Sequence, residues 1–140
     1  MGHVPTGPLP AEGEGPHLPR RERRGAGAAR DLDLSDRAAV GDAGERIAAR
    51  FLSDHGLRVL ARNVGVGTGE IDLLAIDHGV RVVAEVRAIT GDGDPIDAVG
   101  ARKRQRVRRL AAMAGAQRVD FVGVRLGVDG VVVHWVPGCG

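Results

Sequence analysis

The sequence predicts an α/β or α+β domain in which helices pack on a single sheet, and three observations indicate this class. The chain has 140 residues, a length typical of one domain. Hydrophobic residues make up 43% of it, but only Phe51, Phe121 and Trp135 are aromatic, so an aliphatic core is expected. Apolar residues recur at strand spacing in five segments and at helix spacing in two others. The resulting order, α-β-β-β-α-β-β, favours one sheet flanked by helices.

Residues 1–34 differ in composition from the rest and are expected to form a disordered tail before a domain at 35–137. Five of the seven prolines lie in the first 19 residues, and the run RRERRGAGAAR follows. Such a segment cannot bury enough apolar surface to offset the entropy lost on ordering. Its arginines are expected to be solvated, and the alternative is that they add non-specific attraction for phosphate.

The first element after the tail is expected to be an amphipathic helix that Ser35 or Asp36 caps. Apolar residues recur between 40 and 52 at spacings of three and four, and Gly56 is placed to end the helix. Glu45 lies at the border of this apolar stripe, where it either reaches over the sheet or is simply solvated.

Three strands, a second helix and a final hairpin are expected to follow. The segment 89–95 reads ITGDGDP and is a loop by composition, and Asp129-Gly130 marks the last turn. The expected strands are 57–63, 67–77, 80–87, 118–126 and 130–136, and the expected helix is 97–116.

Acidic residues interrupt the most apolar part of the chain. If His78-Gly79 is a two-residue turn, Asp72 lies opposite Glu85 and Glu70 lies opposite Arg87, with all four on one face. Opposed Cβ atoms are about 5 Å apart, so two carboxylates there repel unless a cation or a proton lies between them. This spacing suits one hard divalent cation such as Mg²⁺.

The alternative is a solvated polar side of the hairpin. A register slip of one residue would also move Asp72 and Glu85 to opposite faces. The same face carries Leu74, Ile76 and Val83, however, and a solvated face should be more polar, so the site interpretation is favoured.

The second helix is strongly basic. Seven of the chain's 20 basic residues lie between 101 and 118, and Arg102, Arg106 and Arg109 are candidate contacts for backbone phosphates. The alternative is a solvated charged helix. Lys103, the only lysine, falls in the apolar stripe and is expected to point towards the sheet. No aromatic residue is interleaved with these charges, so base stacking is not expected.

The sequence disfavours several classes of protein. Cys139 is the only cysteine, so no internal disulfide can form, which fits a reducing cytoplasm. No apolar run approaches the roughly 20 residues of a membrane span, and no secretory signal is evident. The five histidines lack zinc-ligand spacing. A cytoplasmic location without membrane association is therefore expected.

Four motifs occur together in a specific order: GDAGERIAARFLSDHGLRVLARN, GEIDLLA, VVAEVR and AVGARKRQRVRRLA. In this combination the chain resembles the YraN family of bacterial endonuclease-like proteins over about residues 39–136. It is also similar to archaeal Holliday-junction resolvases. Both belong to the PD-(D/E)xK group, so the resemblance implies a restriction-endonuclease-like fold with a central mixed sheet flanked by helices.

The resemblance also implies roles for matching residues. Asp72 and Glu85 look like the metal-binding pair, and Glu45 like the helix carboxylate that completes it. Arg87 stands where the family motif commonly has lysine, and arginine cannot act as a base because it does not lose its proton. Ile89 replaces a second basic residue of the motif. Three further residues match family positions of less defined role, namely Glu70, Asn63 and Lys103.

Three hypotheses about function follow. The first is a Mg²⁺- or Mn²⁺-dependent nuclease that hydrolyses DNA phosphodiester bonds and prefers structures, such as branches, to sequences. The second is a nucleic-acid-binding protein of nuclease fold whose activity is weak or lost, which the changes at Arg87 and Ile89 motivate. The third is a structural domain without a DNA role. Nucleases of this fold often dimerise, so a homodimer is among the expected partners.

Overall fold

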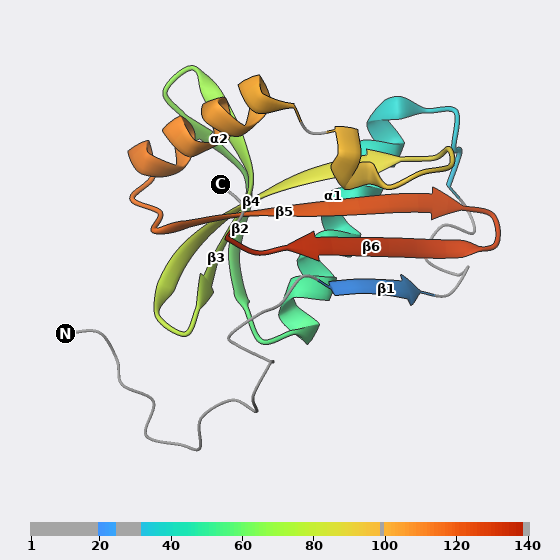
Figure 1. Ribbon diagram of the computed structural model, residues 1–140, viewed down its shortest axis with the longest axis horizontal. Coiled ribbons are helices and arrows are strands. Elements are labelled where there is room, and N and C mark those ends of the chain that lie inside the picture. Colours follow the sequence, from blue (N-terminus) through green and yellow to red (C-terminus); the bar gives the residue numbers. More distant parts are fainter. Residues whose placement is uncertain (1–19, 25–31, 99, 139–140) are drawn as a thin grey trace.

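A computed structural model describes residues 20–24, 32–98 and 100–138. Its sheet has six strands in the order β1-β6-β5-β4-β3-β2, and every neighbouring pair is antiparallel except β4 and β5. The mixed α/β class is therefore confirmed, and from α1 onward the elements follow the expected order (Figure 1). The elements are β1 (Arg20–Arg24), α1 (Arg37–Asp54), β2 (Arg58–Val66), β3 (Gly69–Asp77), β4 (Val80–Ile89), η2 (Pro95–Ala98), α2 (Ala101–Met113), β5 (Arg118–Gly127) and β6 (Gly130–Val136).

Each face of the sheet carries its own apolar core. Successive residues of a strand point to opposite faces, and β4 shows this directly. Ala84 packs with Phe51 of α1, whereas Val83 packs with Val107 of α2. Figure 1 shows α1 behind the strands and α2 beside the end of the β2–β3 hairpin. The sheet therefore separates α1 from α2.

Helix α1 begins and ends as its sequence predicts. The carboxylate of Asp36 accepts a hydrogen bond from the amide of Ala39 at 3.1 Å, so Asp36 and not Ser35 is the cap. Gly56 has φ +94°, a conformation that favours glycine after a helix. Gly44 allows the helix to approach the sheet closely, because a Cβ there would lie 2.6 Å from the Cβ of Ala88.

The second helix is shorter than the predicted 97–116. Gly100 is extended at the N-cap of α2, so the segment divides into the short 3₁₀ turn η2 and α2. Arg118, counted among the basic residues of 101–118, is the first residue of β5, as the predicted strand 118–126 has it. Pro95 of η2 packs so closely on β5 that a Cβ at Gly123 would lie 2.5 Å from the proline ring.

The prediction of a disordered tail over 1–34 is wrong for Arg20–Arg24. These residues form β1, which pairs antiparallel with β6 along the edge of the sheet. Backbone hydrogen bonds to an open edge need no apolar side chains, so composition gave no sign of this strand. Arg21 forms an ion pair with Asp94, and Glu22 lies 3.4 Å from Nε2 of His55. Residues 1–19 and 25–31 lie outside the described residues.

A buried network of hydrogen bonds joins the end of β3 to β5 and β6. Asp120 is fully buried and accepts two hydrogen bonds from Arg118, at 2.8 and 2.9 Å, and one from Trp135 at 3.0 Å. Arg118 also donates to buried Asp77 at 2.7 Å. The backbone amide of Gly138 completes the set at 2.9 Å. These acids are satisfied structural groups, because each buried carboxylate has the charged or polar partners that burial requires.

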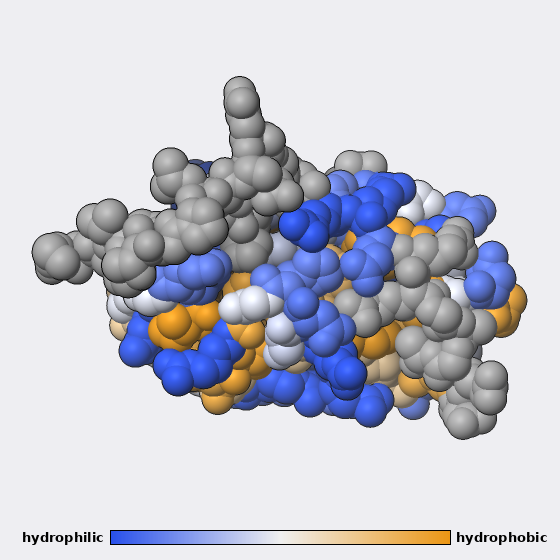
Figure 2. All heavy atoms as spheres, turned by 90° about the horizontal axis from the view of Figure 1, so that it is seen from below, coloured by the Kyte–Doolittle hydropathy of each residue, from blue (hydrophilic) through white to orange (hydrophobic). Residues whose placement is uncertain are grey.

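The surface is mostly polar. Figure 2 shows one face on which hydrophilic side chains border smaller hydrophobic patches. The exposed large apolar residues among those described are Leu60, Met113 and Val128, from three different parts of the chain. No helix in the described ranges is long and apolar enough to cross a membrane.

Candidate active site

The β3–β4 hairpin has the register that the sequence predicts. His78 and Gly79 form the turn with φ of 50° and 84°, so Asp77 pairs with Val80. Positive φ at both central residues matches the twist of antiparallel strands. The paired ladder then continues as far as Leu73 and Ala84.

Beyond the Leu73–Ala84 pair, a side chain of β3 takes the place of its backbone in hydrogen bonding to β4. The amide of Val86 donates to the carboxylate of Asp72 at 2.8 Å, and Asp72 also hydrogen-bonds the carboxyl group of Glu85. The two acids that counting across the turn predicted to be opposed are therefore in contact. They lie where β3 and β4 cease to pair, while β3 continues along β2 and β4 continues along β5.

The electrostatics of this carboxylate pair are unusual. Burial, followed by the hydrogen bond and the negative charge of Glu85, raises the pKa of Asp72 from 3.8 to about 8. The Val86 amide and the charge of Lys103 act in the opposite direction, with smaller effect. The raised pKa favours the protonated form of Asp72 at neutral pH, because two negative charges in contact inside the protein would repel each other.

Lys103 supplies positive charge next to the carboxylate pair. Its Nζ lies 3.2 Å from Oε2 of Glu85, whose side chain is only 12% exposed. The predicted direction of Lys103, from α2 towards the sheet, is therefore confirmed. Helix position explains this contact, because Lys103 lies one turn before Val107, which is buried against the same face of the sheet.

Glu45 approaches the pair from the opposite face. Burial, and then the negative charge of Asp72, raises the pKa of Glu45 above its usual value. Arg62 lies 3.5 Å from Oε1 of Glu45, and Asn63 also hydrogen-bonds it, which partly offsets both effects. Glu45 of α1 is therefore electrostatically coupled to Asp72 of β3, and its role at the site stays a prediction.

Strand β2 contributes Arg62 and Asn63 to the surroundings of the carboxylate pair. Arg62 pairs with Leu73 of β3 and Val64 with Ile71, so Asn63 between them lies level with Asp72. Asn63 has φ +54°, an unusual conformation for a side chain other than glycine. Arg62 also donates to Asp42 at 3.0 Å, while its buried Nε has no hydrogen-bond partner among the described atoms.

Residues 44–124 match the model of the uncharacterised protein family UPF0102, which is the YraN family. The chain belongs to this family. The UPF0102 protein of Symbiobacterium thermophilum is 46% identical over 65% of this chain and 86% of its own length. The relative from Streptomyces coelicolor is 42% identical over 76% of this chain and 92% of its own. The relative from Nocardia farcinica is 41% identical over 75% and 84% respectively.

One solved structure also resembles this UPF0102 protein. SfsA of Pyrococcus furiosus, in complex with Ca²⁺, has 15% identity and a TM-score of 0.36 over 73% of this chain and 64% of that chain.

Two predicted site residues lie apart from the carboxylates of this UPF0102 protein. Glu70 is exposed and pairs with Gly65 of β2, so the predicted opposition of Glu70 and Arg87 is wrong. The reason is that β2, not β4, pairs with the first residues of β3. Arg87 is exposed and lines a neighbouring pocket. The candidate phosphate contacts of α2 are exposed as expected, namely Arg102, Arg106 and Arg109.

Sequence reasoning missed Arg62. The signal was its position beside Asn63 in a strand that precedes GEID, but a basic residue in a strand has many solvated alternatives. Within the described residues, no group of three histidine, cysteine, aspartate or glutamate side chains is close enough to hold a metal ion. The compact part of the site is therefore the Asp72–Glu85 pair with Lys103, and Glu45 is a more distant neighbour.

Proposed function

We propose that this UPF0102 protein is a divalent-metal-dependent nuclease that hydrolyses phosphodiester bonds of DNA. The observation that carries the proposal is the Asp72–Glu85 pair, in which burial and a neighbouring acid raise the pKa of Asp72 to about 8. Carboxylates with pKa values perturbed by burial and a neighbouring charge are typical of functional sites. Family membership and a mixed sheet with helices on both faces are consistent with the nuclease-like fold.

The residues fit a hard cation. Asp72 and Glu85 offer adjacent carboxylate oxygens, the donors that Mg²⁺ and Mn²⁺ prefer. In the metal-free protein the ammonium of Lys103 lies beside Glu85, and a divalent ion would bring further positive charge to the pair. Among the described residues Glu45 is too distant to form one group with this pair, so it would have to move towards the ion to complete the donor set. When bound, such an ion lowers the pKa of a water ligand and polarises the phosphate.

The basic side chains of the protein have separate roles in the proposed reaction. Lys103, held 3.2 Å from Glu85, would stabilise negative charge that develops on the phosphate. Arg87 would contact the phosphate backbone from the neighbouring pocket, since it cannot act as a base. Arg62 would position Glu45 by holding one of its oxygens at 3.5 Å.

Helix α2 would hold the substrate without reading its sequence. Its exposed arginines suit phosphate oxygens, which carry no base identity. No aromatic residue lies on this helix to stack against a base. We therefore expect the enzyme to select the shape of DNA, such as a branch or a flap, rather than a sequence. The phosphate contacts are the exposed residues Arg102, Arg106 and Arg109.

The test is cleavage of branched and flapped DNA with Mn²⁺, comparing the wild type with Asp72→Asn. Loss of the carboxylate should lower the rate by about 100-fold or more, because a metal ligand contributes several kcal/mol. Asp129→Asn is the matched control, since Asp129 is an exposed acid in the β5–β6 turn. Equal rates for the wild type and Asp72→Asn would contradict the proposal. Binding without cleavage by either protein would favour a nucleic-acid-binding protein of nuclease fold.

A further inference from the structure

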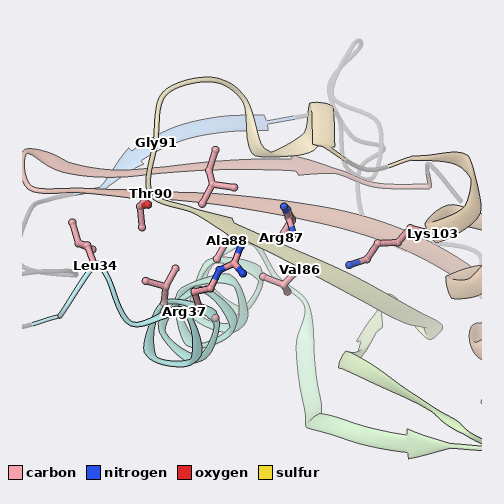
Figure 3. A pocket seen from close by; sticks show the side chains of 11 residues that line it. Leu34, Arg37, Val86, Arg87, Ala88, Thr90, Gly91 and Lys103 are labelled. Carbon is pink, nitrogen blue, oxygen red and sulfur yellow. The ribbon is translucent and has the colours of Figure 1, made fainter.

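A pocket of about 610 Å³ lies beside the carboxylate pair, between the start of α1 and the end of β4. Figure 3 shows Arg37 reaching from α1 towards the end of β4, while Lys103 reaches from the other side towards Val86 and Arg87. Lys103 belongs to the pocket and also contacts Glu85. The pocket, hereafter the α1–β4 pocket, is therefore continuous with the candidate active site.

The α1–β4 pocket has an excess of positive charge. Arg37, Arg87 and Lys103 come from three different elements, and no acidic residue is among the described side chains that line it. Arg37 and Arg87 form no ion pair with any residue that the structure describes. Like charges in one hollow repel, and a bound anion would relieve this repulsion.

Apart from the three cations, the lining is uncharged and consists of aliphatic residues, two glycines and Thr90. Gly44 holds α1 close to β4 at Ala88. No aromatic side chain is present for a base to stack on. Three cations beside aliphatic side chains suit the phosphate and the sugar of a nucleotide. A volume of this order accommodates a small ligand, whereas a base-paired helix is much wider than the pocket.

We propose that the α1–β4 pocket binds the sugar–phosphate backbone of an unpaired DNA strand that extends from the bond to be cut. Its link to cleavage rests on the proposed function, because Lys103 lines the pocket and also contacts Glu85 of the candidate site. Arg37 is a new substrate-positioning residue in this assignment. The proposal makes a single-stranded extension part of the recognised substrate and leaves paired DNA to the exposed face of α2.

The experiment measures binding in EDTA, where no cleavage occurs, by fluorescence anisotropy. Two labelled probes share one duplex sequence, and only one of them carries a single-stranded tail. Arg37→Gln should weaken binding of the tailed probe about fivefold to tenfold and lower its salt slope by about 0.7, the loss of one single-strand phosphate contact. Binding of the blunt probe should not change. Arg50→Gln, an equal charge change at an exposed position of the same helix, should affect both probes alike.

A third probe carries a tail of abasic sugar–phosphate. Its affinity should match that of the ordinary tail within about twofold, because the pocket offers nothing for base stacking. Equal losses for tailed and blunt DNA in Arg37→Gln, no loss in either, or failure of the abasic tail would overturn the inference. Asp72→Asn separates the two proposals, since it should abolish cleavage yet retain the effect of the tail. A tail effect without wild-type cleavage would refute the nuclease and leave the pocket assignment standing.

Discussion

At the scale of single residues, Asp72 makes the stability of the metal-free protein depend on pH. Its pKa is raised from 3.8 to about 8 in the folded state, chiefly by burial. A carboxyl group whose pKa is higher in the folded state stabilises the fold fully at pH values below its unfolded-state pKa. This contribution is lost as the pH rises towards its folded-state pKa. The free energy of unfolding should therefore fall between about pH 4 and pH 8 through this residue.

We predict that Asp72→Asn removes this part of the pH dependence. At pH 8 in EDTA the variant should be more stable than the wild type by roughly 2–4 kcal/mol, and at pH 4 the two should be similar. Urea unfolding at both pH values measures the difference. A variant that is no more stable at pH 8 would show that the wild-type pair tolerates two charges without a cation.

Residue patterns predicted the carboxylate pair but not its surroundings. Counting across His78-Gly79 placed Asp72 against Glu85, because one turn fixes the register of a hairpin. Arg62 could not be placed in this way, since the register of β2 and β3 shifts between Val59 and Ala61 and no pattern marks that bulge. Long-range contacts of this kind depend on tertiary packing, which periodicity does not record.

At the scale of elements, the contact between α1 and β4 determines how close Glu45 comes to Asp72. Gly44 is the point of closest approach, because an added Cβ would lie 2.6 Å from the Cβ of Ala88. Gly41, one turn earlier on the same helix, has no atom within 4 Å of such a Cβ. The two glycines therefore differ in packing while sharing the same helix.

We predict opposite effects for alanine at these two glycines. Gly44→Ala should lower the free energy of unfolding by about 1–3 kcal/mol, because the helix must shift away from the strand. Gly41→Ala should raise it by up to about 1 kcal/mol, since alanine favours the helix. Urea unfolding of both variants measures the effects. Stabilisation by Gly44→Ala would contradict the close packing of α1 on β4.

Elements were predictable where local chemistry defines them. The Asp36 cap and Gly56 predicted the bounds of α1 closely, and alternation predicted the five strands from β2 to β6. Strand β1 was missed because it is stabilised by the open edge of β6 and not by its own composition. The second helix was predicted too long because Gly100 interrupts an otherwise continuous pattern.

At the scale of the whole molecule, the network around Arg118 joins segments that are distant in sequence. Arg118 of β5 bonds Asp77 at the end of β3 and Asp120 within β5. Trp135 of β6 and Gly138 near the C-terminus bond Asp120 as well. Removing one partner from such a set leaves an uncompensated buried charge, which is more costly than the loss of one hydrogen bond.

We predict that Asp120→Ala lowers the free energy of unfolding by about 3–5 kcal/mol, because Arg118 loses a buried counter-charge. Asp129→Ala, at an exposed position of the following turn, should change it by less than about 0.5 kcal/mol. Thermal or urea unfolding compares the two variants. A small effect of Asp120→Ala would show that water replaces the carboxylate and that the network does not hold the strands together.

The pairing of β1 with β6 bears on the order of folding. Arg20 pairs with Trp135, so this contact joins the two ends of the described chain, whereas the β2–β3 and β3–β4 hairpins are local. Contacts between distant segments form late, because the entropy of closing a long loop must be offset first. Until β1 docks, β6 presents an unpaired edge to other chains. The pairing of the arginine-rich strand β1 with β6 would then protect the newly folded protein from aggregation through this edge.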